Sequence, residues 1–131
     1  MKRLVIFAAY EKSGIVYDYV LSYLEYLRQI SDAIVFVADN EPNPAELSKL
    51  APFVNHIECS HHGEYDFGSY KRGFNYAKSH YLLDDTDEVL FCNDSCFCTD
   101  CLSAVFDKMQ SSACDFWSMT GSYEYEEHLQ S

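Results

Sequence analysis

Apolar runs and helical patterns alternate along the whole chain. Residues 4–9 and 33–38 are apolar without polar alternation, which is typical of strands that are covered on both faces. From Val16 the apolar positions recur at helical spacing, so a helix is expected between these two runs. The same pattern predicts further strands at residues 53–58, 88–92 and 115–119, and further helices from Asn43, over 70–80 and after Thr99.

Local signals support several of these elements. Asn43, Pro44 and Glu46 combine an N-cap, a proline at the first helical position and an acidic third residue, so a short helix is expected to begin there. Thr99 is expected to cap the last helix, whose apolar positions share one face: Leu102, Val105, Phe106 and Met109. Phe116 and Trp117 are neighbours in the last predicted strand, so both are expected to be buried, on opposite faces.

This alternation predicts an α/β fold with three layers, α-β-α, around a mainly parallel sheet with right-handed crossovers. The 131 residues suit a single domain, residues 1–131. In such sheets, ligands bind outside the carboxyl ends of the strands. Tyr10, Asp39 and Asp94 follow three of the predicted strands and are therefore expected to meet in one crevice.

The composition excludes several classes of partner. Nine Lys and Arg against 21 Asp and Glu give a formal net charge of -12, so neither nucleic acid nor an anionic membrane surface is an expected partner. No run approaches the roughly 20 apolar residues of a transmembrane helix. The first apolar stretch is also too short for a signal peptide, so a cytoplasmic location is expected, at the inner face of the membrane only through partners.

Cysteine usage leaves two interpretations open. Cys59, Cys92 and Cys114 lie in or beside apolar runs, which suits reduced thiols that pack as small hydrophobic side chains. A zinc or iron–sulfur site is the alternative for four closely spaced cysteines, Cys92, Cys96, Cys98 and Cys101. Because Cys92 lies inside a predicted strand and no second paired motif follows, the thiol cluster is the preferred interpretation.

The tripeptide Asn93-Asp94-Ser95 ends a buried strand. A carboxylate there is desolvated on one side, and it could hold a hard divalent cation while a diphosphate supplies further oxygens. The alternative is an ordinary turn, since Asn, Asp and Ser are common turn residues.

The segment 61–72 is the second candidate. It contains Gly63 and Gly68, a helix start whose N–H groups suit anions, and the basic pair Lys71-Arg72. It matches no P-loop or dinucleotide fingerprint, so an ordinary strand-to-helix loop is the alternative. His61-His62 could ligate a metal, but adjacent side chains diverge, and a solvated pair is expected.

Taken together, these blocks resemble the rhamnan synthesis protein F family of bacterial cell-surface polysaccharide assembly, over essentially the whole chain. The blocks are Val5 to Tyr10, Gly63 followed by Tyr65 to Lys71, Glu88 to Ser95, Asp115 to Trp117, and His128 to Ser131. One departure is Cys96-Phe97-Cys98, which stands where the family has a Gly-Pro-like turn.

The resemblance implies a Rossmann-like nucleotide-binding half of a GT-A glycosyltransferase. Asn93-Asp94-Ser95 would stand where that class keeps its Asp-x-Asp motif, with Asp94 as the ligand of Mg²⁺ or Mn²⁺. Asp39 would lie near the nucleoside base. The implied donor-binding residues are Tyr10, Asp39, Gly63, Asp66, Lys71, Asn93, Asp94 and Ser95.

The expected function is therefore a rhamnosyltransferase-like domain that binds a nucleotide-diphosphate sugar, such as dTDP-rhamnose, and serves a saccharide acceptor in rhamnan or O-antigen synthesis. The resemblance also implies that the chain is a donor-binding half, truncated at its C-terminal end, that does not transfer sugar alone. A non-catalytic nucleotide-sugar-binding or assembly module is one alternative, and a small cysteine-based metal-binding domain is another. A homo-oligomer is compatible with each.

Overall fold

A sheet of four parallel strands forms the centre of the computed structural model, which describes residues 1–122 and 128–130. The strands lie in the order β3-β2-β1-β4, and their bounds are β1 Arg3–Ala9, β2 Ala33–Ala38, β3 His56–Cys59 and β4 Glu88–Asn93. Ala9 pairs with Ala38, Ala38 pairs with Cys59, and Ala8 pairs with Asn93. All four carboxyl ends therefore lie at one edge of the sheet.

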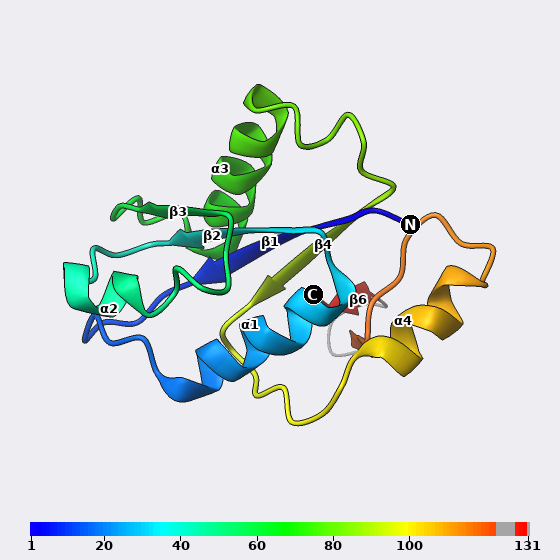
Figure 1. Ribbon diagram of the computed structural model, residues 1–131, viewed down its shortest axis with the longest axis horizontal. Coiled ribbons are helices and arrows are strands. Elements are labelled where there is room, and N and C mark those ends of the chain that lie inside the picture. The colour runs from blue at the N-terminus through cyan, green and yellow to red at the C-terminus, as the bar shows by residue number, and fades with distance from the viewer. Residues whose placement is uncertain (123–127, 131) are drawn as a thin grey trace.

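Helices cover both faces of this sheet (Figure 1). On one face, Phe7 and Phe36 pack among Val20, Leu24 and Leu27 of α1 (Asp18–Ile30). On the other face, the alternate strand residues pack against Tyr70 and Ala77 of α3 (Tyr65–Ser79). The predicted α/β fold with a parallel sheet is confirmed.

Two shorter helices complete the layers. Helix α2 (Pro44–Ser48) begins as predicted, because the side chain of Asn43 accepts a 3.0 Å hydrogen bond from the backbone N–H of Glu46. Helix α4 (Ser103–Gln110) buries Phe106. The expectation that Thr99 caps α4 is wrong, because Leu102 stands at the N-cap position. Helix α3 also begins at Tyr65, five residues before the predicted start.

The predicted strand at residues 115–119 is wrong. These residues lie in no strand, and a short antiparallel pair, β5 (Thr120–Ser122) with β6 (His128–Gln130), follows them. Phe116 is 75% exposed and Trp117 is only half-buried. The indole of Trp117 packs edge-on against Phe106, with ring centroids 5.0 Å apart, and its Nε1 donates to Glu88 Oε1 at 3.2 Å. Contacts with a helix and a strand end, rather than sheet pairing, thus hold this aromatic segment.

Cys114, expected to be packed, is exposed. Ser131, the last residue of the blocks that carry the resemblance, lies outside the described residues. Within residues 1–122 and 128–130, every helix is too short or too polar to cross a bilayer.

Candidate functional site

A cavity of about 400 Å³ opens at the carboxyl edge of the sheet. It is bounded by the residues that follow β1, β2 and β4 and by the loop and first turns of α3. Six of the predicted donor-binding residues line it: Tyr10, Asp39, Gly63, Asp66, Asp94 and Ser95. The structure thus brings these six residues together, while their role as donor ligands stays a prediction.

Asp94 is held by the end of the neighbouring strand. Its Oδ2 accepts a hydrogen bond from the backbone N–H of Tyr10 at 2.9 Å, and the hydroxyl of Tyr19 donates to its backbone oxygen at 3.0 Å. Burial raises the pKa of this carboxyl, and the nearby negative charge of Asp66 raises it further. Asp94 is therefore a fixed and partly desolvated carboxylate on the cavity wall.

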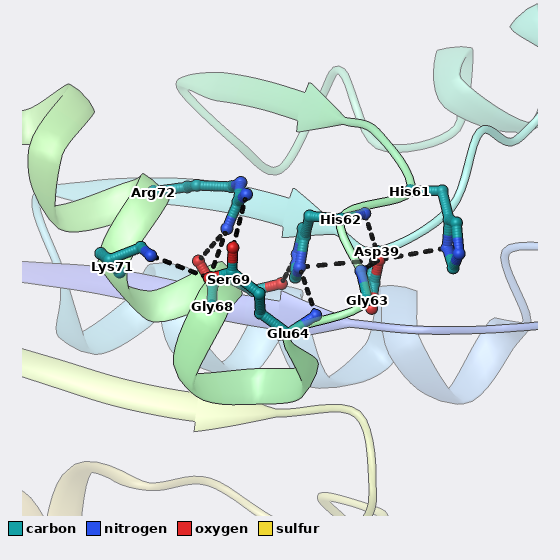
Figure 2. Close-up of polar contacts among 9 residues, drawn as sticks. All are labelled: Asp39, His61, His62, Gly63, Glu64, Gly68, Ser69, Lys71 and Arg72. Atoms are coloured by element: carbon teal, nitrogen blue, oxygen red, sulfur yellow. Dashed lines mark hydrogen bonds and ion pairs between the residues drawn. The ribbon is translucent and has the colours of Figure 1, made fainter.

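Asp39 organises the loop that leads into α3 (Figure 2). Its Oδ1 accepts hydrogen bonds from the backbone N–H groups of His62, at 2.7 Å, and Gly63, at 2.9 Å. Burial acts to raise the pKa of Asp39, but the hydrogen bonds from Gly63 and His62 lower it, and the pKa lies below the ordinary carboxyl value. Asp39 is thus an ionised carboxylate that shapes the cavity wall.

His62 lies inside this loop. Its side chain is only 3% exposed, whereas that of His61 is 77% exposed. The expected solvated pair is therefore wrong for His62. Its Nδ1 accepts a hydrogen bond from the backbone N–H of Glu64 at 3.0 Å, and its Nε2 lies 2.9 Å from Ser69 Oγ. An accepting Nδ1 assigns the hydrogen to Nε2, so the ring is neutral in this arrangement and Nε2–H donates to Ser69.

Sequence reasoning missed His62 and Ser69 as loop-forming residues. The sequence carries only an indirect signal, the glycine at position 68. In the folded loop, a Cβ at this position would lie 2.3 Å from Glu64 Cβ and 3.0 Å from His62 Cε1. The glycine leaves the room that the buried imidazole and the preceding turn occupy.

Asn93 and Asp66 connect the sheet to α3. Asn93 Nδ2 donates to Asp66 Oδ2 at 2.8 Å, and this bond holds the Asp66 carboxylate at the cavity. Asn93 does not itself line the cavity, so the structure assigns it a supporting contact.

Lys71, also a predicted donor-binding residue, lies outside the cavity lining. It projects from α3 toward Glu64, with Nζ 2.8 Å from Glu64 Oε2. Arg72 binds the same carboxylate at 3.2 Å. Hydrogen bonds from Arg72 and then Lys71 lower the pKa of Glu64 to about 2. The reason is helical geometry: Glu64 and Lys71 are two turns apart and share one side of the helix (Figure 2).

The charge of the cavity restricts its ligands. Among the described residues, its lining includes the carboxylates of Asp39, Asp66 and Asp94 and no Lys or Arg. No group of three His, Cys, Asp or Glu side chains within the described residues is arranged to hold a metal ion. A divalent cation at this cavity would therefore have at most two of these side chains as ligands, and oxygens from another source would have to complete its coordination.

The cysteines form no disulfide in the structure. Cys92 is buried, and burial raises its pKa, whereas Cys98 is half-buried and Cys96 and Cys101 are exposed. The four cysteines predicted as a cluster thus differ in environment.

Comparison with known proteins identifies one family. The family model of rhamnan synthesis protein F matches residues 34–131, which include Asp39, the loop into α3 and Asn93-Asp94-Ser95. Neither the curated proteins nor the solved structures include a match to this chain. The family match covers most of the chain and connects it with the synthesis of rhamnan, a polysaccharide. The chain therefore belongs to the rhamnan synthesis protein F family.

Proposed function

We propose that this domain binds a nucleotide-diphosphate sugar in the cavity and acts as the donor-binding part of a glycosyltransferase. The observation that carries the proposal is the meeting of six donor-binding candidates around one cavity at the carboxyl edge of a parallel sheet. Open α/β sheets bind their ligands at this edge. The family's association with rhamnan synthesis supports an activated sugar as the ligand.

Each wall of the cavity would contact a different part of the donor. Tyr10 and Asp39, after β1 and β2, would lie beside the nucleoside, and Asp94 and Ser95 beside the diphosphate. Gly63 and Asp66, from the loop and first turn of α3, would lie beside the sugar. In this proposal the domain works in the cytoplasm, at the inner face of the membrane through partners, and a saccharide is the acceptor.

A divalent cation would make this binding electrostatically favourable. A diphosphate is repelled by the three cavity carboxylates, and the described lining contains no Lys or Arg to offset their charge. Mg²⁺ or Mn²⁺, held by Asp94 and by phosphate oxygens, would neutralise the repulsion. When bound, such a cation would stabilise the negative charge that develops on the departing nucleoside diphosphate.

Calorimetric titration with nucleotide sugars, including dTDP-rhamnose, with and without Mn²⁺, tests the proposal. We expect saturable binding that Mn²⁺ strengthens, and at least tenfold weaker binding by the Asp94→Asn variant, since a charge-assisted contact contributes about 1.5–3 kcal/mol. Asp85→Asn is the matched control, because it removes the same charge from an 84% exposed side chain just before β4, at the opposite edge of the sheet. Equal affinities of the two variants, or no binding by the wild type, would contradict the proposal.

A further inference from the structure

Tyr65 combines an exposed ring with an unfavourable backbone conformation at the cavity. It lines the cavity as the first residue of α3, and it is 84% exposed. Its φ is 59°, in the left-handed region that residues with a Cβ rarely adopt. Such conformations persist where the surroundings impose them, and they concentrate at functional sites.

Contacts within the protein do not account for this ring position. Across residues 1–122 and 128–130, no side chain hydrogen-bonds to Tyr65 and no aromatic ring stacks on it. On both sides of it, by contrast, the chain is fixed: Gly63 donates to Asp39, and Asp66 accepts from Asn93. These two bonds hold the turn that places the tyrosine at the cavity.

The neighbouring carboxylate indicates which part of a ligand would meet this ring. Asp66 uses Oδ2 to accept from Asn93, and its Oδ1 accepts no hydrogen bond from the residues that the structure describes. A free carboxylate oxygen suits a hydroxyl donor, and an exposed aromatic face suits an uncharged ring with C–H groups. A hexose offers both, whereas a phosphate would be repelled by Asp66.

We propose that Tyr65 stacks on the sugar ring of the bound donor, beside hydroxyl contacts to Asp66, and that it contributes to the choice of sugar. This assignment rests on the proposed donor-binding function. In this assignment Tyr65 contacts the sugar and makes no contact with the nucleoside diphosphate.

The chain provides a matched control for the strain. Tyr81 has a φ of 60° and is 77% exposed, but it lies beyond the other end of α3 and does not line the cavity. Glycine relieves a positive φ at either position, so Tyr65→Gly and Tyr81→Gly are both expected to raise the melting temperature. A third variant, Tyr65→Phe, keeps the aromatic ring.

Titrations with dTDP-rhamnose and with dTDP, each in Mn²⁺, test the assignment. We expect Tyr65→Gly to weaken binding of dTDP-rhamnose about tenfold, as the loss of one stacking contact does, and to change binding of dTDP less than about twofold. Tyr65→Phe, which keeps the ring, should lose much less affinity for dTDP-rhamnose than Tyr65→Gly does. Tyr81→Gly should bind both probes as the wild type does.

The outcomes distinguish the two proposals. If wild-type protein binds both probes but Tyr65→Gly weakens both equally or neither, the role of Tyr65 in sugar binding is wrong and donor binding stands. If Tyr81→Gly weakens dTDP-rhamnose binding as much as Tyr65→Gly does, the effect comes from the backbone, and the stacking assignment is overturned. If wild-type protein binds neither probe, the donor-binding function itself is overturned, and the assignment with it.

Discussion

The backbone N–H of Tyr10 donates a 2.9 Å hydrogen bond to Oδ2 of Asp94, across 84 positions of sequence. This bond connects the end of β1 to the residue after β4, at the edge where the cavity opens. It orients the carboxylate before any ligand arrives. A preoriented group loses little conformational freedom when it binds, which favours affinity.

The first prediction concerns the stability of Asp94→Asn. Burial raises the pKa of Asp94, so the folded state holds this proton more tightly than the unfolded state does. The free energy of unfolding must therefore fall as pH rises from the ordinary carboxyl pKa through the raised one. Asparagine keeps an acceptor for the N–H of Tyr10 and has no charge to desolvate. We expect the variant to be at least as stable as the wild type at about pH 7.

Urea denaturation of both proteins at about pH 7 and about pH 3 measures this effect. The advantage of the variant should shrink at the lower pH, where Asp94 is protonated in both states. A variant that is less stable at neutral pH would mean that the ionised carboxylate supports the fold. The main role of Asp94 would then be structural.

Asp39→Asn should have the opposite sign. Hydrogen bonds from the N–H groups of Gly63 and His62 lower the pKa of Asp39 despite its burial. The resulting stability is present above the ordinary carboxyl pKa and is lost as pH falls through the lowered one. Because hydrogen bonds to a charged acceptor are stronger than those to a neutral one, we expect a loss of about 1–2 kcal/mol at neutral pH.

The same denaturation series tests Asp39→Asn. The difference from wild type should disappear at a pH low enough to protonate Asp39 in the folded protein. A constant difference at every pH would show that geometry, rather than charge, makes Asp39 important to the loop.

Gly73 allows α3 to lie close to the sheet. A Cβ at this position would be 2.5 Å from Ile6 Cγ2 and 3.2 Å from Val37 Cγ2, and both of those side chains are fully buried. Gly73→Ala gains helix propensity of up to about 1 kcal/mol, but overpacking a core costs about 1–3 kcal/mol. We expect a net loss of about 1–2 kcal/mol in the free energy of unfolding.

Asn75→Ala is the control for Gly73→Ala, because it lies on the same helix at an exposed position. It should be neutral or slightly stabilising in the same thermal or urea denaturation. A Gly73→Ala variant as stable as Asn75→Ala would mean that α3 can shift away from Ile6 without loss of packing.

The sheet and the edge where its cavity opens could be predicted because their signals are local and strong. Continuous apolar runs at residues 4–9 and 33–38 require cover on both faces, which in turn implies parallel strands with helices between them. Parallel strands end at one edge, so the meeting of Tyr10, Asp39 and Asp94 follows from topology alone.

Other features depend on contacts that no local pattern encodes. Phe116 and Trp117 have the composition of a strand, but Trp117 packs on α4 and bonds to Glu88 instead. The direction of Lys71 depends on the acidic partner two helical turns away. The burial of His62 results from the Asp39 carboxylate and from the room beside Gly68, which are apparent only once the loop has folded.

The last prediction concerns thiol reactivity. Cys101 is exposed just before α4, with its Sγ 2.9 Å from Ser103 Oγ. Hydrogen bonds from the hydroxyl and then the backbone N–H of Ser103 lower the pKa of Cys101. Because the thiolate is the nucleophile, we expect iodoacetamide near neutral pH to modify Cys101 first, while buried Cys92 resists. Mass spectrometry of a time course at several pH values measures this order.

Ser103→Ala should slow the modification of Cys101 at neutral pH. At high pH the thiol is ionised in both proteins, so the variant's rate should approach that of the wild type. Equal rates at every pH would mean that the serine hydroxyl does not stabilise the thiolate.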